Sequence, residues 1–457
     1  METIFIFTAI AGSFLYLITI NWRKLVIATL ILLVFEGVLR KWVLPQASNS
    51  IYFLKDFILL AAYINYYSKS KLPIIIFNKN FSKTFNEFIC VLFTICFIQA
   101  FNPSLGSVLI GFFGIKNYLF YTPLVWMLPN LFTSKEELCK FLRFYLLLTI
   151  PICILAIAQF FSPPDSPINI YASGDIENIA TFGVGGREGA VRVTGTFPYI
   201  SGFGVYLSTS LISIIPLLSI RQIAVWQMLT ILELLLVVVC SFMTGSRAVV
   251  FFAAIYFVGY LGILLFNKIH LFNLSYKKFI IPIVVVYLSV TLFFNKSVDL
   301  FTQRTVKNQE EGATRVLGPL IEPWLLPFRF DGYGTGASHQ ATPRLREILQ
   351  VPTLDVEIPP ANDGSSIKVM LDLGPIGLII WDGFRFYLLF ALWHTFKRLK
   401  DPFLAQLGLS ILLFGAIQFT SSLVSNPTFS LYYWFFVGFI FLLPKLDNME
   451  EGSEGEL

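Results

Sequence analysis

Residues 197–266 read FPYISGFGVYLSTSLISIIPLLSIRQIAVWQMLTILELLLVVVCSFMTGSRAVVFFAAIYFVGYLGILLF, which is three long apolar stretches joined by short polar turns. A helix that crosses a bilayer needs about 20 mainly apolar residues. In lipid, every backbone N–H and C=O must be satisfied internally, so only helices and closed barrels span membranes. Barrel strands would give alternating segments of about ten residues, whereas these runs are continuous. The stretch therefore predicts consecutive transmembrane helices.

The whole chain shares this apolar character. Of its 457 residues, 56% are hydrophobic and 13% are charged, and its mean hydropathy is +0.73. Soluble domains carry about one quarter charged residues. Counting apolar stretches of spanning length gives about 12 or 13 transmembrane helices. We therefore expect an all-α polytopic membrane protein. Its five cysteines show no paired metal-site spacing, so we expect them to be packing residues. The candidate site residues named below require no metal.

Short basic loops predict the orientation of these helices. Lys and Arg occur at residues 21–24, 68–84, 131–137, 267–278 and 394–402, which all fall on one side if the spans alternate. The positive-inside rule makes that side cytoplasmic. Two longer polar loops, residues 162–196 and 296–367, then lie on the outer face. The net charge of +5 is spread over loops and indicates membrane orientation, not nucleic-acid binding.

Two terminal parts of the chain stand apart from these loops. Residues 1–104 hold N-terminal transmembrane helices. Residues 445–457 (KLDNMEEGSEGEL) form an acidic tail, which we expect to be cytoplasmic.

Basic residues on the outer face are candidates for an anion site, because the positive-inside rule disfavours them there. Most are arginines, whose planar guanidinium can bind two phosphate oxygens at once. The candidates include Arg187, Arg192, Arg247 and Arg315. The alternative for any one of them is a solvated loop charge. Arg192 and Arg247 are favoured, since each adjoins small residues (VTGT and TGS) that let a ligand approach the backbone.

Three further residues could bind or transfer protons. Lys116 lies inside an apolar stretch, where a charge is a functional candidate by default, although its side chain could instead snorkel to the headgroups. His339 follows GYGTG at 332–336 and could act as a general base, or be a solvated loop residue. Asp363 could take a proton from a sugar hydroxyl, or cap the helix that follows it.

Four segments carry a resemblance to a known family. They are RVTGTFPYISGFGVYL (192–207), SFMTGSRAVV (241–250), TRVLGPLIEPWLLPFRFDGYGTG (314–336) and DGSSIKVMLDLGPIGLIIW (363–381). In order and in placement beside apolar spans, they resemble the bacterial O-antigen ligase and O-antigen polymerase family. The resemblance covers roughly residues 105–444 and implies that they form one polymerase- or ligase-like membrane core, which includes both outer loops.

The resemblance implies a glycosyltransferase C-like multi-pass protein of the bacterial cytoplasmic membrane. Its activity would transfer or polymerise undecaprenyl-pyrophosphate-linked oligosaccharide on the outer face, for surface polysaccharide assembly. The expected partners are that lipid-linked glycan, an acceptor glycan or lipid, membrane lipids and a regulator of chain length, with no cofactor and no nucleic acid.

Residue by residue, Arg192, Arg247 and Arg315 match basic positions that would hold the pyrophosphate, and we add Arg187 and Lys116 as candidates. The catalytic histidine of the family falls on Asp363, so the base is either Asp363 or His339.

This departure favours a polymerase or exopolysaccharide-type relative over a ligase. The main alternative is a transporter or flippase of lipid-linked glycans, which would show paired repeats and midplane charges. A peptidoglycan-type polymerase and an inactive or regulatory relative also remain open.

Overall fold

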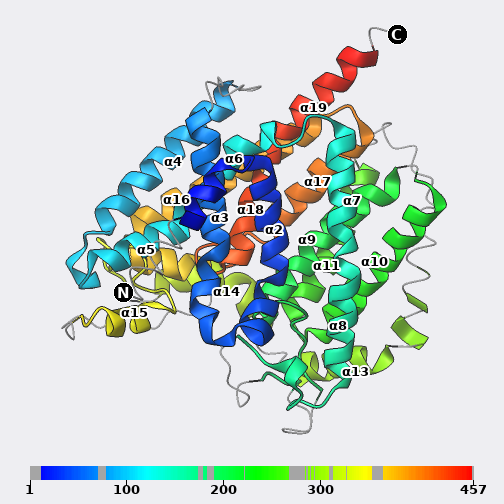
Figure 1. Ribbon diagram of the computed structural model, residues 1–457, viewed down its shortest axis with the longest axis horizontal. Coiled ribbons are helices and arrows are strands. Elements are labelled where there is room, and N and C mark those ends of the chain that lie inside the picture. Colours follow the sequence, from blue (N-terminus) through cyan, green and yellow to red (C-terminus); the bar gives the residue numbers. More distant parts are fainter. Residues whose placement is uncertain are drawn as a thin grey trace. The chain divides into compact units, whose positions relative to one another are not determined.

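The computed structural model describes residues 12–69, 79–172, 179–182, 190–220, 222–266, 284, 287–288, 290–292, 294–307, 312–325, 327–351 and 364–454. Every named element in this part of the chain is a helix, and the one extended pairing is an isolated bridge between Thr181 and Val191. The predicted all-α fold is confirmed (Figure 1).

Seven described helical segments are long and apolar enough to cross a membrane: Phe81–Gln99, Val108–Asn130, Lys135–Phe161, Ile200–Ser219, Ala224–Met243, Ser365–Arg398 and Pro427–Met449. A bent pair, Gly12–Thr19 with Trp22–Val43, would make an eighth. The predicted 12 or 13 spans also counted shorter stretches, as well as spans that include residues 3–11 and 279–283, which lie outside the described part. The chain is a multi-pass membrane protein.

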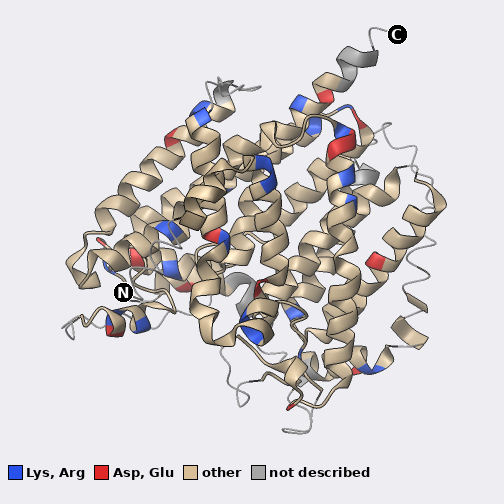
Figure 2. Ribbon diagram, viewed as in Figure 1, with Lys and Arg blue, Asp and Glu red and all other residues tan. Residues whose placement is uncertain are grey.

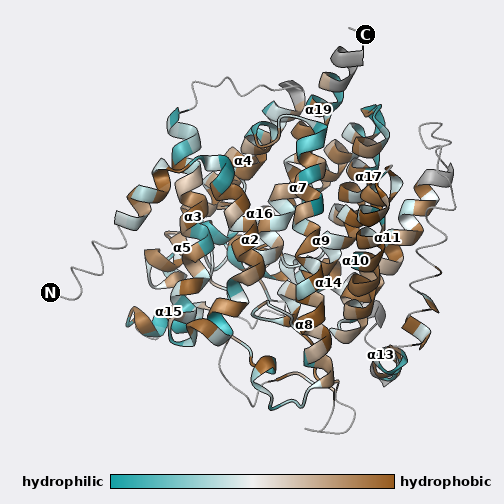
Figure 3. Cartoon of the chain, turned by 45° about the vertical axis from the view of Figure 1, so that its right-hand side comes forward, coloured by the Kyte–Doolittle hydropathy of each residue, from teal (hydrophilic) through white to brown (hydrophobic). Residues whose placement is uncertain are grey.

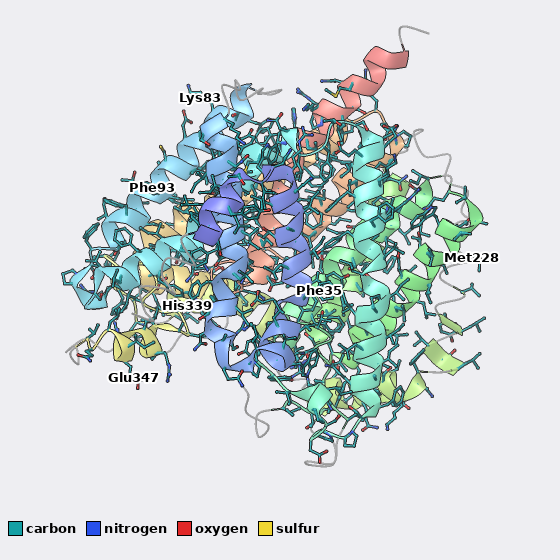
Figure 4. All side chains as sticks on the ribbon, in the orientation of Figure 1. Phe35, Lys83, Phe93, Met228, His339 and Glu347 are labelled. Carbon is teal, nitrogen blue, oxygen red and sulfur yellow. The ribbon has the colours of Figure 1, made fainter. Side chains whose placement is uncertain are left out.

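The surface of these helices is suited to lipid. Met228 is 71% exposed and Phe93 is 50% exposed, and both side chains project outward from their helices (Figure 4). Hydrophobic residues dominate the helices in Figure 3, while charged positions are sparse along them in Figure 2. Exposed apolar side chains of this density are expected where lipid, not water, is the solvent.

The chain forms two compact units, each described here by itself. Unit 1 comprises Met1–Ile75, Leu131–Ala254 and Phe272–Lys307, and unit 2 comprises Ile76–Asn130, Ile255–Leu271 and Asn308–Leu457. The boundary falls inside helix α11 (Arg247–Phe266).

Unit 1 contains α2 (Trp22–Val38), α3 (Ser48–Lys69), α7 (Lys135–Leu147), α8 (Thr149–Phe161), α9 (Ile200–Ser219), α10 (Ala224–Met243) and α13 (Asn295–Lys307). Helix α2 packs on α3, and α10 packs on α8 and α9. In α9, the buried hydroxyls of Ser208, Thr209 and Ser213 donate to carbonyls of the same helix. Polar residues are therefore buried in this helix with their hydrogen bonds satisfied.

Unit 2 contains α4 (Lys79–Gln99), α5 (Val108–Leu119), α6 (Leu124–Met127), α14 (Gly312–Leu325), α15 (Thr342–Ile348), α16 (Ser365–Arg398), α17 (Pro402–Ile417), α18 (Pro427–Val437) and α19 (Phe439–Glu454). Helix α16 packs against α4, α14, α17 and α19. The helix α17 begins with its N–H groups capped by the Asp401 carboxylate. It ends at Ile417, where a polar turn begins, and Asn426 then caps α18.

Helix α16 is broken at Gly374, which has φ 73° and ψ −179°. This conformation is essentially restricted to glycine. Pro375 follows, and it lacks the N–H that would bond the carbonyl of Leu371. The Leu371 carbonyl instead accepts from the Tyr333 N–H at 2.7 Å, and the Asp372 carbonyl accepts from the Gly334 N–H at 3.1 Å. A loop thus supplies the hydrogen bonds that the break removes.

We predict that Gly374→Ala destabilises the protein by on the order of 3 kcal/mol. A Cβ at this position would lie 2.4 Å from the Phe330 carbonyl oxygen, and the backbone conformation is itself unfavourable for alanine. Thermal unfolding in detergent measures the loss.

The matched control is Gly383→Ala in the same helix, where a Cβ meets nothing within 4 Å. We expect this variant to unfold at the same temperature as the wild type or slightly higher, since alanine is the better helix former. Equal loss in both variants would contradict the role assigned to Gly374.

Candidate functional site

The segment GYGTGASH (332–339) forms a loop that contacts α4, α5 and α16. Thr335 donates its N–H to the Gln99 carbonyl at 3.3 Å and its hydroxyl to the Cys96 carbonyl at 2.8 Å, which satisfies the end of α4. Gly336 has φ 85°, and a Cβ there would lie 2.9 Å from the Gly114 Cα in α5. The glycines are therefore needed for the backbones to touch.

The carboxylate of Asp372 anchors this loop to α16. It is 1% exposed and accepts the Gly336 N–H at 3.0 Å, the Ser338 N–H at 2.9 Å and the Tyr118 hydroxyl at 3.1 Å. A buried carboxylate is tolerated when several donors surround it. Asp372 thus fixes the position of the loop.

His339 lies at the end of the loop (Figure 4). Its ring is nearly perpendicular to the ring of Phe113, and the two centroids are 4.9 Å apart. Its Nδ1 accepts the Ala341 N–H at 3.0 Å, so the neutral ring carries its proton on Nε2. Burial lowers the pKa of His339 to about 4, helped by the positive charges of Lys368 and Lys116. At neutral pH, the ring is uncharged and presents an N–H donor at Nε2.

Two lysines complete this cluster in unit 2. Lys368, on α16, is 2% exposed and donates from Nζ to the Ser425 hydroxyl at 3.1 Å. Lys116 comes from α5 and is close enough to His339 to act on its pKa. Buried cations in membrane helices commonly mark substrate or ion sites. Two ammonium groups beside an imidazole N–H donor form a suitable environment for an anion.

A second cluster, in unit 1, is built around Arg192. The backbone N–H of Arg192 donates to the Ala180 carbonyl at 2.9 Å, and the side-chain Nε–H donates to the Thr244 carbonyl at 3.0 Å. Gly245 has φ 59°, and a Cβ there would lie 3.0 Å from the Arg192 Nε. The structure therefore brings Arg192 against the TGSR turn, whose Arg247 begins α11.

The segment that carries Arg192 is held by two buried side chains. The Gln159 Oε1 accepts the N–H groups of Thr194 and Gly195 at 3.2 and 2.8 Å. The Lys41 Nζ donates to the Gly195 carbonyl at 2.8 Å and to the Thr194 hydroxyl at 3.0 Å. The buried backbone N–H and C=O groups of this non-helical segment therefore have hydrogen-bond partners.

The residues predicted from sequence are thus distributed over both units. Arg192 and Arg247 belong to the cluster in unit 1, whereas Lys116 and His339 belong to the cluster in unit 2. Arg315 lies on α14, but its side chain is outside the described part, as are residues Asp363 and Arg187. Within the described residues, no group of three or more His, Cys, Asp and Glu side chains is placed to hold a metal ion.

Sequence reasoning missed Lys368, Gln159 and Lys41. Lys368 had the same signal as Lys116, a charge at an apolar span, and could have been found by that rule. Gln159 and Lys41 could not, because their partners lie 35 and 153 residues away along the chain.

No protein-family pattern matches this chain, and no curated protein sequence matches it.

We predict that Asp372→Asn destabilises the protein by about 2 kcal/mol. The asparagine NH₂ cannot accept a hydrogen bond, so at least one buried donor among Gly336 N–H, Ser338 N–H and the Tyr118 hydroxyl loses its partner. The change is measured as the shift of thermal unfolding in detergent.

Asp331→Asn is the matched control, since the Asp331 side chain is 62% exposed and pairs with Arg329 on the surface. Such a pair contributes about 0–1 kcal/mol, so we expect a small effect. An Asp372→Asn variant as stable as this control would show that the loop does not depend on the carboxylate.

Proposed function

We propose that this protein is a membrane glycosyltransferase that transfers or polymerises undecaprenyl-pyrophosphate-linked oligosaccharide on the outer face of the bacterial cytoplasmic membrane. The observation that carries the proposal is the cluster of Lys116, Lys368 and His339 in a membrane-embedded unit. A lipid pyrophosphate brings its charge to such a unit on an apolar tail, which suits a cationic site reached from lipid. The resemblance to the O-antigen ligase and polymerase family supports the same reaction class.

In the proposed reaction, a hydroxyl oxygen of the acceptor sugar attacks the anomeric carbon of the donor. The bond between that carbon and the pyrophosphate oxygen breaks, and the lipid pyrophosphate leaves with the electron pair. Lys116 and Lys368 stabilise the charge that develops on the leaving group. Fixed charges of this kind need no rearrangement during the reaction.

The acceptor proton passes to a base, for which Asp363 is the favoured candidate. In the described arrangement, His339 presents Nε2–H, so it donates a hydrogen bond to an anionic oxygen of the donor. Action of His339 as the base would require its Nδ1 to release the Ala341 N–H. The imidazole is therefore better suited to donating a hydrogen bond to the leaving pyrophosphate than to accepting the acceptor's proton.

One observation favours the alternative of a lipid-linked glycan transporter. Transporters often place broken helices and charges at their substrate sites, and α16 is broken at Gly374 close to Asp372. The carbonyls that this break frees are, however, occupied by the N–H groups of Tyr333 and Gly334. They are not available to a coupling ion, which weakens the alternative.

The test uses the purified protein in lipid with an undecaprenyl-pyrophosphate oligosaccharide, with products resolved by size. We expect turnover, and we expect Lys368→Met to lower kcat/KM by about a hundredfold, since it removes one charge from the leaving-group site. A ladder of products indicates a polymerase, and one added block on a separate acceptor indicates a ligase.

Arg344→Gln is the control for this variant, because the Arg344 side chain is 72% exposed on α15. We expect its kcat/KM to equal that of the wild type. Absence of turnover together with movement of the lipid between leaflets would overturn the proposal in favour of a transporter.

The pKa of His339 gives a second prediction. The folded protein holds this pKa at about 4, below the ordinary value of about 6.5, so the unfolded chain binds the proton first as the pH falls. Stability is then fully present above about pH 6.5 and decreases toward pH 4. Between pH 7 and pH 5, we expect His339→Gln to lose less stability than the wild type, by on the order of 2 kcal/mol. Thermal unfolding at the two pH values measures this difference, and parallel losses would contradict the neutral, buried state of the ring.

A further inference from the structure

A cavity of about 180 Å³ lies at the C-terminal end of α16, in unit 2. Its walls come from α4 (Phe81), α16 (His394, Thr395 and Arg398) and α19 (Asp447 and Asn448). After its break, α16 continues from Ile376 to Arg398 over about 35 Å, and Lys368 lies before the break. The cavity is therefore distinct from the cluster of Lys116, Lys368 and His339.

The cavity is built by a proline in α19. Pro444 lacks the N–H that would bond the Ile440 carbonyl, and the Thr395 hydroxyl donates to that carbonyl at 3.5 Å instead. Asp447 accepts the N–H groups of Lys400 and Asp401 at 3.0 and 2.8 Å, which ties the turn after α16 to α19. The walls are thus fixed by hydrogen bonds between helices.

The rim of the cavity is basic. Arg398 is exposed at this end of α16, and Lys397 lies over the ring of Trp393 with its Nζ 4.6 Å from the centroid. This turn is one of the short basic loops that the positive-inside rule places in the cytoplasm. Basic pockets between helices on that face are suited to anionic lipid headgroups. Aromatic side chains at the same depth, such as Trp393, are typical of the membrane interface.

An apolar track leads from the cavity along the lipid-facing side of α16. Phe390 and Phe386 are each 60% exposed. Phe390 lies 6.2 Å from Phe81 and 6.4 Å from His394 between ring centroids, and both of these residues line the cavity. Acyl chains that lie against Phe386 and Phe390 would place a headgroup at the cavity mouth.

We propose that this cavity binds a glycerophospholipid with one anionic phosphate, of the phosphatidylglycerol class, from the cytoplasmic leaflet. The Arg398 guanidinium binds the phosphodiester in a bidentate manner. A volume of 180 Å³ corresponds to about six water molecules, which accommodates a glycerol headgroup. The glycerol hydroxyls face Asn448 and the Asp447 carboxylate. The negative charge of Asp447 disfavours a second phosphate, which selects against lipids that carry two.

The test measures radiolabelled phosphatidylglycerol retained by the full-length immobilised protein in detergent. The salt concentration is about 1 M, where the Debye length falls to about 3 Å and diffuse surface attraction is screened. We expect the wild type to retain phosphatidylglycerol in preference to phosphatidylcholine. We expect Arg398→Gln to lower the retained amount about tenfold, because it removes a charge-assisted bidentate contact.

Two further variants separate a site from general surface charge. Lys83→Gln removes an equal charge at the same end of unit 2, where the Lys83 side chain is 79% exposed, and we expect no change. Asn448→Trp fills the cavity mouth without altering charge, and we expect retention to fall as it does in Arg398→Gln.

Each of three results would overturn the proposal: equal retention of the two lipids by the wild type, equal losses in Arg398→Gln and Lys83→Gln, or unchanged retention in Asn448→Trp. Thermal unfolding of each variant in the same detergent confirms that it is folded. The glycosyl-transfer assay is not involved, so this result stands or fails independently of the proposed activity.

Discussion

The break in α16 at Gly374 and Pro375 is the constraint on which the rest of unit 2 depends. A buried carbonyl without a partner is costly in a medium that cannot supply hydrogen bonds. The break frees two carbonyls, and the N–H groups of Tyr333 and Gly334 satisfy both. The loop that follows must then lie along α16, which places the Gly336 and Ser338 N–H groups on the Asp372 carboxylate. Backbone geometry in one helix thereby determines where His339 lies.

In unit 1, buried charged side chains likewise have partners that compensate them. Glu36 lies between Arg40 and Lys55, with both ion pairs at 2.9 Å. Removing one partner from such a group would leave an uncompensated buried charge. Lys41, the next residue after Arg40, instead donates to the segment that carries Arg192. Arg40, Lys41 and Lys55 are therefore structural groups buried within unit 1.

The sequence was sufficient for the fold class because lipid imposes long apolar runs, and these are visible without any long-range information. It also indicated His339, Lys116, Arg192 and the TGSR turn as candidates, because charge there interrupts apolar sequence or adjoins glycine. The anchoring roles of Asp372, Gln159 and Lys41 could not be predicted, since each depends on backbone groups far away in the sequence.

A rigid frame of this kind matters for the proposed chemistry. Transfer between two sugars requires the reacting groups to be held in a productive geometry, and any disorder lost on binding reduces the available binding energy. The loop that ends in His339 is already bonded to the end of α4 through Thr335, to α16 through Gly336 and Ser338, and to Thr342 at the start of α15 through the Gly336 carbonyl. Its imidazole is therefore oriented before any ligand arrives. A donor group fixed in this way can act on a leaving group without reorganisation, which is where electrostatic stabilisation is most effective.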